Sequence, residues 1–549
     1  MMIHSLLFYN YVTNITNYIV QTMFLKILIL ILFFAVMIGV GIYCRKTANN
    51  VQGFVLGDRK VGSWLTAFAF GTSYFSAVIF VGYAGQFGWK YGLSATWIGL
   101  GNALIGSLLA WRILGRRTRL MTQYLKSATM PDFFGQRFNS QALKVAASVI
   151  VFVFLIPYTA SLYNGLSRLF GLSFGIDYSW CVLGMAVLTG IYVLVGGYMA
   201  TAVNDFIQGM IMLVGIVAVI LSVLNGNGGF TAAIEKLSQL QSESAPALNG
   251  AFVSFFGPQP IYLLGVVLLT SLGTWGLPQM VGKFYAIRDE AAIRKGTFIS
   301  TFFAIIVAGG CYFLGGFGRL YADVIEYGAK GPIYDSIVPS MLQTLPDLMI
   351  GVVIILVLSA SMSTLSSLVL TSGSTLTLDI IKPALAKGGK NMSEKSQLLS
   401  IRLLVVFFIA VSSVLAIIQA KSSVTFIAQL MGISWGALAG AFLAPFLYGL
   451  YWKKTTKASV WASFIVGVGI MCCCMYGTFT GTTFISPFFS SPINAGVLAM
   501  VAGLVIVPIV SAFTKVNEKD SVEKMFGCYE RQVTVHASTS LMDADEVKK

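Results

Sequence analysis

Long runs of apolar residues, separated by short polar connections, make up most of the chain. Each run is near or above the roughly 20 residues that a helix needs to cross a bilayer. We therefore expect an all-α polytopic membrane protein with about thirteen transmembrane helices. The expected spans are residues 25–44, 64–88, 92–114, 143–171, 179–199, 203–224, 260–284, 297–318, 346–380, 401–420, 423–452, 459–479 and 492–513.

Composition excludes a water-soluble fold. Of the 549 residues, 56% are hydrophobic and 10% are charged, and the mean hydropathy is +0.81. Soluble domains carry about 25% charged residues, and a soluble fold of this length could not hide so much apolar surface. The net charge of +15 does not indicate a nucleic-acid partner, because the basic residues are scattered between the apolar runs.

Lys and Arg are shared unevenly between the two sets of alternate connections. One set, together with the C-terminal tail, holds 29 of the 36 basic residues, with Lys283 counted among them. The positive-inside rule then predicts an outside N-terminus and a cytoplasmic C-terminus in the cell membrane. An odd number of spans agrees with this orientation.

Two of the predicted spans contain breaks. The second has a polar, glycine-containing stretch at 70–76, followed by Gly82, Gly85 and Gly88, and the seventh reads Ser-Leu-Gly-Thr-Trp-Gly-Leu-Pro at 271–278. One such segment could be a packing glycine or a simple kink. Two of them, five spans apart, favour a repeated five-helix unit whose first helix is discontinuous beside a central cavity.

This repeat divides the chain into successive parts. The expected parts are an N-terminal extension (1–22), a first span with its cytoplasmic link (23–62), a first five-helix repeat (63–225), an extracellular loop (226–258), a second five-helix repeat (259–452), two C-terminal spans (453–514) and a cytoplasmic tail (515–549).

The ninth span is the richest in hydroxyl groups. Ala360, Ser363, Thr364 and Ser367 fall on one helical face, and Ser366 is adjacent to it. Such residues also occur at ordinary helix–helix contacts. Hydroxyl and carbonyl oxygens are, however, the ligands that a hard cation needs.

Charged and nucleophilic groups within the spans are sparse. Asp205, near the start of the sixth span, is either a functional intramembrane carboxylate or an interfacial one solvated by headgroups. The two histidines, His4 and His536, lie near the ends, which excludes a His-based metal site or proton relay in the core. No paired carboxylates, Ser–His pair or P-loop fall at membrane depth, so we expect a transporter and not an enzyme.

Five short motifs follow one another along the chain. They lie at residues 56–59, 130–134, 196–208, 276–278 and 362–366. In this order they resemble the sodium:solute symporter family over about residues 54–455, and they are most similar to the motifs of its bacterial sodium/proline symporters. The resemblance implies the leucine-transporter fold, a 5+5 inverted repeat with broken helices at spans 2 and 7.

The resemblance also implies a sodium site between the second and ninth spans. The carbonyls of Thr72, Phe75 and Ala360 and the hydroxyls of Ser363 and Thr364 would hold the ion. Some family members have a second site, and the residues that match it are Asp205, Ser363, Ser366 and Ser367. The chain thus permits two sodium ions per cycle, and Na+ is the only metal or cofactor expected.

The substrate cavity is expected among the second, fourth, seventh and eleventh spans. Each polar or aromatic side chain there could equally pack or bond between helices. The candidates are Tyr74, Ser76, Tyr158, Ser161, Asn164, Thr274, Trp275, Gln279 and Gln429.

Some positions depart from the patterns of particular family members. Tyr74 and Thr270 stand where the sodium/proline symporters have an aspartate and a tryptophan, and Leu155 is nearest to an arginine of the sialic acid symporters. No buried Lys or Arg is available to bind a carboxylate. An anionic substrate would use helix N-termini or the sodium ion itself.

These features together predict sodium-coupled symport of a small organic solute into the cell by alternating access. An amino acid or related carboxylate is favoured. Sugars or other neutral solutes, and proton-coupled or passive transport on the same fold, stay open. The expected partners are the solute and the lipid bilayer, with no nucleic acid and no obligate protein partner.

Overall fold

The computed structural model describes residues 26–174, 176–328, 331–420, 427–483, 485–516 and 519–530. The described chain is mostly helical, with one short hairpin of β1 (Tyr327–Gly328) and β2 (Gly331–Pro332). The predicted extension at 1–22, with His4, and the end of the tail, with His536, lie outside the described residues.

Among the described residues, ten helices are long and apolar enough to cross a membrane, and a bent pair makes an eleventh candidate. The bent pair is α11 (Pro260–Leu272), continued by η7 (Gly273–Gly276), with α12 (Pro278–Ala286). The ten are Lys26–Ala48, Val78–Tyr124, α8 (Gln141–Phe174), α9 (Tyr178–Gly226), α13 (Glu290–Gly315), α15 (Asp347–Thr375) with its continuation, α17 (Glu394–Ala420), α18 (Ile427–Tyr451), α19 (Lys457–Thr480) and α20 (Pro492–Phe513).

Shorter helices cap the two ends of this bundle or continue the long helices. They are η1 (Arg45–Ala48), α2 (Val51–Leu56), η2 (Gly57–Arg59), α3 (Ser63–Tyr74), η3 (Val78–Tyr83), α4 (Ala84–Tyr91), η4 (Gly92–Ala95), α5 (Thr96–Gly101), η5 (Asn102–Leu109), η6 (Trp111–Gly115), α6 (Arg116–Tyr124), α7 (Met130–Arg137), α10 (Phe230–Ser238), η8 (Gly318–Tyr321), α14 (Tyr334–Gln343), η9 (Leu376–Ile381), α16 (Lys382–Lys387), α21 (Lys519–Phe526) and η10 (Gly527–Tyr529).

Both predicted breaks are present. Helix α3 ends at Phe75, whose backbone (φ −99°, ψ 88°) is not helical, and the chain becomes helical again in η3. In the seventh span Leu277 is extended (φ −88°, ψ 119°), Pro278 starts α12, and the two halves are bent by 46°. The proline fits there because the first position of a helix does not need its own N–H.

Helix α13 shows how the second span runs on into the third. Gly71 of α3 lies against Phe303, and Gly88 of α4 lies against Gly315, further along α13. The chain therefore ascends beside α13 through the broken span. At Gly92, with φ +61°, the path changes.

The segment after Gly92 descends along the same helix. Gly99 lies against Gly309, and the ring of Trp111 lies against Gly296 near the start of α13. The long helical run Val78–Tyr124 consequently contains a reversal at Gly92.

A second reversal divides α9. Gly196 contacts Gly41 in the first helix, and Gln208 donates a hydrogen bond to Met37, one turn away in that helix. A straight helix would separate Gly196 from Gln208 by about 18 Å at 1.5 Å per residue. The chain therefore folds back at Gly197, whose φ of +56° and ψ of −150° are open to glycine but not to other residues. The exact total of thirteen crossings stays a prediction.

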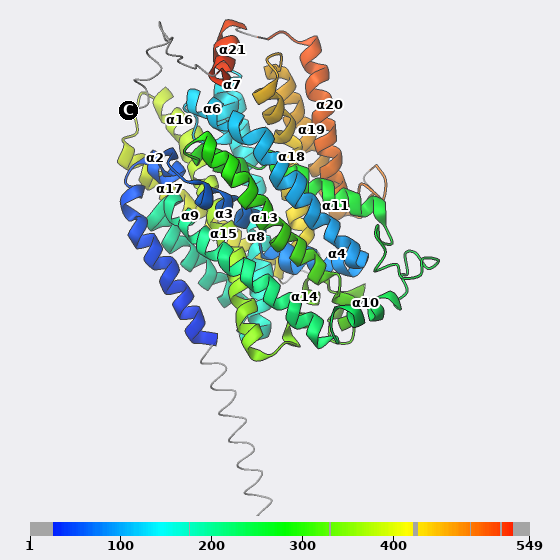
Figure 1. The fold of residues 1–549 in the computed structure, drawn as a ribbon. Coiled ribbons are helices and arrows are strands. Elements are labelled where there is room, and N and C mark those ends of the chain that lie inside the picture. The colour runs from blue at the N-terminus through cyan, green and yellow to red at the C-terminus, as the bar shows by residue number, and fades with distance from the viewer. Residues whose placement is uncertain are drawn as a thin grey trace, which may run out of the picture.

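Burial separates central helices from peripheral ones. In the most apolar stretch of each helix, 94% of the residues are buried in α18 and 72% in α15, whereas 22% are buried in Lys26–Ala48. Figure 1 shows Lys26–Ala48 (blue) on one flank and α19 with α20 (orange) on the other. Large apolar side chains such as Leu403 and Phe407 of α17 point outward, which fits a surface solvated by lipid.

The two sides predicted from Lys and Arg are opposite ends of the bundle. Helices α6, α7, α16 and α21 gather at one end, and α10 and α14 at the other (Figure 1). The exposed Gln123 in α6 lies at the first end, and the exposed Gln241, just after α10, at the second.

We predict that these ends face the cytoplasm and the outside, respectively. Gln241→Cys should react with a membrane-impermeant thiol reagent added to intact cells, and Gln123→Cys should react only after the cells are opened. The unmodified chain, with its own cysteines, sets the background. Labelling of Gln123→Cys but not Gln241→Cys in intact cells would contradict the orientation.

Candidate functional site

The broken end of α3 is held against the hydroxyl face of α15. Ser363 Oγ and Thr364 Oγ1 each donate a hydrogen bond to the Thr72 carbonyl at 3.1 Å. The same hydroxyls lie 3.2 Å from the Ala360 carbonyl. Two carbonyl and two hydroxyl oxygens thus converge, and the four residues are fully or almost fully buried.

The break explains why carbonyls are available here. A helix leaves its last four carbonyls without intrahelical donors, and the negative end of its dipole lies there. In α3 the N–H of Phe75 still bonds to Gly71, so the unpaired carbonyls begin at Thr72. Phe75 itself, the fifth residue predicted for this site, is buried at the break. A buried cluster of carbonyl and hydroxyl oxygens suits a hard monovalent cation.

Two members of the second predicted set, Asp205 and Ser367, lie around an unexpected third group. Lys283 of α12 donates a hydrogen bond to Ser367 Oγ at 2.9 Å, and its Nζ is 3.7 Å from Asp205 Oδ2. Ser366 instead donates to the Ser363 carbonyl at 2.8 Å. An ammonium group therefore lies between two of the four predicted ligands.

One of the two alternatives for Asp205 and one expectation for Lys283 fail at this point. Asp205 is not an interfacial carboxylate, because its side chain is completely buried. Lys283 does not lie in a cytoplasmic connection, because its side chain is only 4% exposed. The expectation that no Lys or Arg is buried is therefore wrong as well. The cause is the bend at Leu277, which keeps α12 inside the bundle where a straight span would already have left it.

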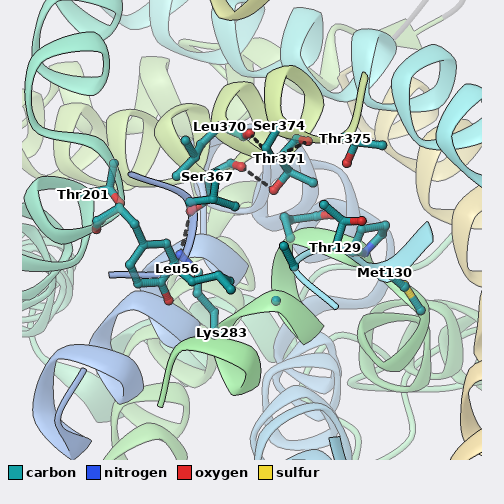
Figure 2. A pocket seen from close by; sticks show the side chains of 16 residues that line it. Leu56, Thr129, Met130, Thr201, Lys283, Ser367, Leu370, Thr371, Ser374 and Thr375 are labelled. Carbon is teal, nitrogen blue, oxygen red and sulfur yellow. Dashed lines mark hydrogen bonds between the residues drawn. The ribbon is translucent and has the colours of Figure 1, made fainter. Parts of the chain in front are cut away.

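A small cavity adjoins this group. It measures about 50 Å³ and is lined by Lys283, Gln279, Ser367 and Tyr198 together with residues of α2, α7 and α15. Figure 2 shows Lys283 reaching from α12 toward Ser367 at its edge. This volume holds a few water molecules. A larger cavity of about 850 Å³ opens at the α6–α7–α16 end, and Leu56 and Ala128 line both.

Comparisons with known proteins decide the family. The family model described as the sodium:solute symporter family matches residues 54–469. The chain belongs to this family. The osmoregulated proline transporter OpuE of Bacillus subtilis is 29% identical over 91% of this chain and 97% of its own length. The sodium/proline symporter 2 of Staphylococcus saprophyticus is 29% identical over 80% of this chain and 84% of its own.

A solved structure gives the fold. The chain is similar to a substrate-bound, outward-open Na+-coupled sialic acid symporter, with a TM-score of 0.71, 17% identity, and coverage of 90% of this chain and 99% of that one. The leucine-transporter fold with broken second and seventh spans is thereby confirmed. As a family member, the chain is a multi-pass membrane protein that couples solute symport to sodium.

In this symporter the substrate candidates fall into two groups. Ser76, Tyr158 and Gln279 are buried and have side-chain polar atoms that make no hydrogen bond to any described residue. The others, apart from the half-buried Gln429 at the start of α18, already have protein partners. Their contacts are Tyr74 with the Thr270 carbonyl, Ser161 with the Tyr158 carbonyl, Asn164 with Tyr178, Thr274 with the Ser271 carbonyl and Trp275 with the Ile105 carbonyl.

Trp435 belongs to the aromatic group beside the break in α3, although it was not among the residues expected from the sequence. Its ring is 5.9 Å from those of both Tyr74 and Tyr158, and its indole N–H makes no hydrogen bond to a described residue. The available signal was a tryptophan among small residues in the eleventh span, which reads Gly-Ile-Ser-Trp-Gly at 432–436. Ser76, Tyr158 and Trp435 form the polar and aromatic group beside the break in α3.

A charged cluster lies further toward the α6–α7–α16 end. Lys144 pairs with Asp132 at 2.7 Å and with the buried Asp379 at 3.3 Å, and Thr129 donates to Asp379 at 2.6 Å. Asp132, Lys144 and Asp379 line the larger cavity. The cluster ties α7, α8 and η9 together at this end of the bundle.

Proposed function

We propose that this symporter takes up proline, or a closely similar small amino acid, together with sodium bound between α3 and α15. The observation that carries the proposal is the contact of Ser363 and Thr364 with the Thr72 carbonyl. Uptake would run from outside to the cytoplasm across the cell membrane.

The sodium assignment rests on the chemistry of the oxygens. In the present arrangement the hydroxyl protons satisfy the Thr72 and Ala360 carbonyls. A cation entering the cluster would take over both carbonyls, and the hydroxyls could rotate to offer lone pairs. Because the group is buried, water competes poorly for these ligands, and the carbonyl end of α3 favours positive charge.

The proline assignment rests on the relatives and on the side chains beside the break in α3. Two proline carriers match the chain over most of their length. The rings of Trp435 and Tyr158, 5.9 Å apart, would contact a small apolar ring, and the neighbouring hydroxyls of Ser76 and Tyr158 would offer it hydrogen bonds. The amide groups that begin η3 after the break would suit the carboxylate.

The departures from the sodium/proline pattern are compatible with this substrate. Tyr74 and Thr270, the two exchanged positions, contact each other, since the Tyr74 hydroxyl bonds to the Thr270 carbonyl. The aspartate and the large tryptophan of the sodium/proline pattern are thus replaced here by the large Tyr74 and the small Thr270. Volume-conserving exchanges of this kind are tolerated best in packed interiors.

Removing one hydroxyl of the sodium group should weaken sodium binding. We predict that Ser363→Ala or Thr364→Ala raises the sodium concentration for half-maximal uptake about tenfold or more, equivalent to about 1.4 kcal/mol. Substrate affinity at saturating sodium should change less. The readout is initial uptake in proteoliposomes over a range of sodium concentrations.

Ser361→Ala is the matched control. Ser361 is equally buried in α15, but its hydroxyl bonds to the Val357 carbonyl of its own helix at 2.8 Å. It should leave the sodium dependence unchanged. If all three variants behave like the unmodified chain at equal expression, the hydroxyl face only packs helices.

The substrate is tested by uptake of radiolabelled proline into proteoliposomes. Proline should accumulate above equilibrium under an inward sodium gradient and should not accumulate under an equal potassium gradient. Excess unlabelled proline should abolish uptake, and excess glucose should not. Sodium-driven uptake of another solute that proline fails to inhibit would overturn the substrate and leave sodium coupling in place.

A further inference from the structure

Lys283 is a buried positive charge for which the sodium and substrate assignments have no role. It stands on α12, the second half of the broken seventh span, and its ammonium contacts groups from two other helices. Asp205 of α9 lies 3.7 Å away, and Ser367 of α15 accepts a hydrogen bond at 2.9 Å. The ring of Tyr198 lies 5.5 Å from the ammonium nitrogen.

Asp205 needs a positive neighbour. Its carboxylate is fully buried, and neither oxygen accepts a conventional hydrogen bond from the described residues. A buried carboxylate without compensation is costly in a low-dielectric interior. Lys283 supplies that compensation from within the chain.

We propose that the Lys283 ammonium takes the place of the second sodium ion, so that this symporter carries one sodium ion per cycle. An ammonium and a sodium ion have the same charge and are bound by the same carboxylate and hydroxyl oxygens. The two cations cannot share these ligands, because like charges a few ångströms apart repel strongly where water is excluded. This inference rests on the proposed sodium site between α3 and α15.

Hydrogen bonds also connect the Lys283 ammonium to the proposed sodium site between α3 and α15. Ser367, which accepts from Lys283, exchanges a 2.7 Å hydrogen bond with Ser73, the neighbour of Thr72 in α3. Since Lys283 donates to Ser367, the Ser367 proton can point to Ser73. One chain of contacts therefore runs from Asp205 through Lys283 to the end of α3, and it joins the two broken spans.

The experiment counts sodium ions. Radioactive sodium binding to the purified, reconstituted symporter should saturate at one ion per chain, and the Hill coefficient for sodium in uptake should be close to one. Lys283→Met removes the charge and keeps much of the length, so it leaves Asp205 for a second ion. This variant should bind two ions per chain, with a Hill coefficient above one.

Two further variants test the assignment. Lys283→Arg keeps a positive charge and should bind one ion, and Lys283→Met combined with Asp205→Asn removes both charges and should also bind one. Two ions bound by the unmodified chain would overturn the inference, whether or not the variants fold. One ion bound by a folded Lys283→Met variant would overturn it as well. A failure of the proposed function is distinguishable from a failure of this inference. In that case the unmodified chain would bind no sodium, and its uptake would not depend on sodium.

Discussion

The hydrogen bonds from Ser363 and Thr364 to the Thr72 carbonyl join the broken end of α3 to α15. A helix broken within a membrane must find partners for its free carbonyls inside the protein, since lipid offers none. Here the partners are hydroxyls that a cation can replace. Sodium bound here can then favour only those conformations in which α3 and α15 stay in contact. The reason is that a ligand shifts an equilibrium only by its differential affinity for the states. If sodium binds at the proposed site, the same contact provides both structure and coupling.

The sequence patterns predicted the elements that depend on composition and periodicity. The broken spans and the hydroxyl face of α15 were expected from glycine, proline and serine placed at helical spacing, and the structure brings Thr72, Ala360, Ser363 and Thr364 together. Lys283 could not be placed in this way. A count of charges along the chain assigns a lysine near the end of an apolar run to the connection, and it does not register that the 46° bend at Leu277 keeps α12 buried.

Side chains whose partners are distant in sequence were the hardest to predict. Trp275 appeared available for substrate, yet its indole N–H bonds to the Ile105 carbonyl of the third span at 3.1 Å. Trp435 was missed, although its ring lies 5.9 Å from the rings of both Tyr74 and Tyr158. Sequence spacing orders residues along one helix, whereas a substrate cavity is defined by which polar atoms the other helices leave unpaired. That selection depends on packing between segments more than 100 residues apart.

The proposed sodium site consists of the oxygens of Thr72, Ala360, Ser363 and Thr364. The most direct measurement is a high-resolution experimental map of the symporter in saturating sodium, compared with one in a sodium-free buffer. We expect sodium-dependent density in contact with the Thr72 carbonyl and both hydroxyls, at distances shorter than the roughly 2.7 Å of a hydroxyl hydrogen bond. Identical maps, with both hydroxyls still bonded to the Thr72 carbonyl in sodium, would contradict it.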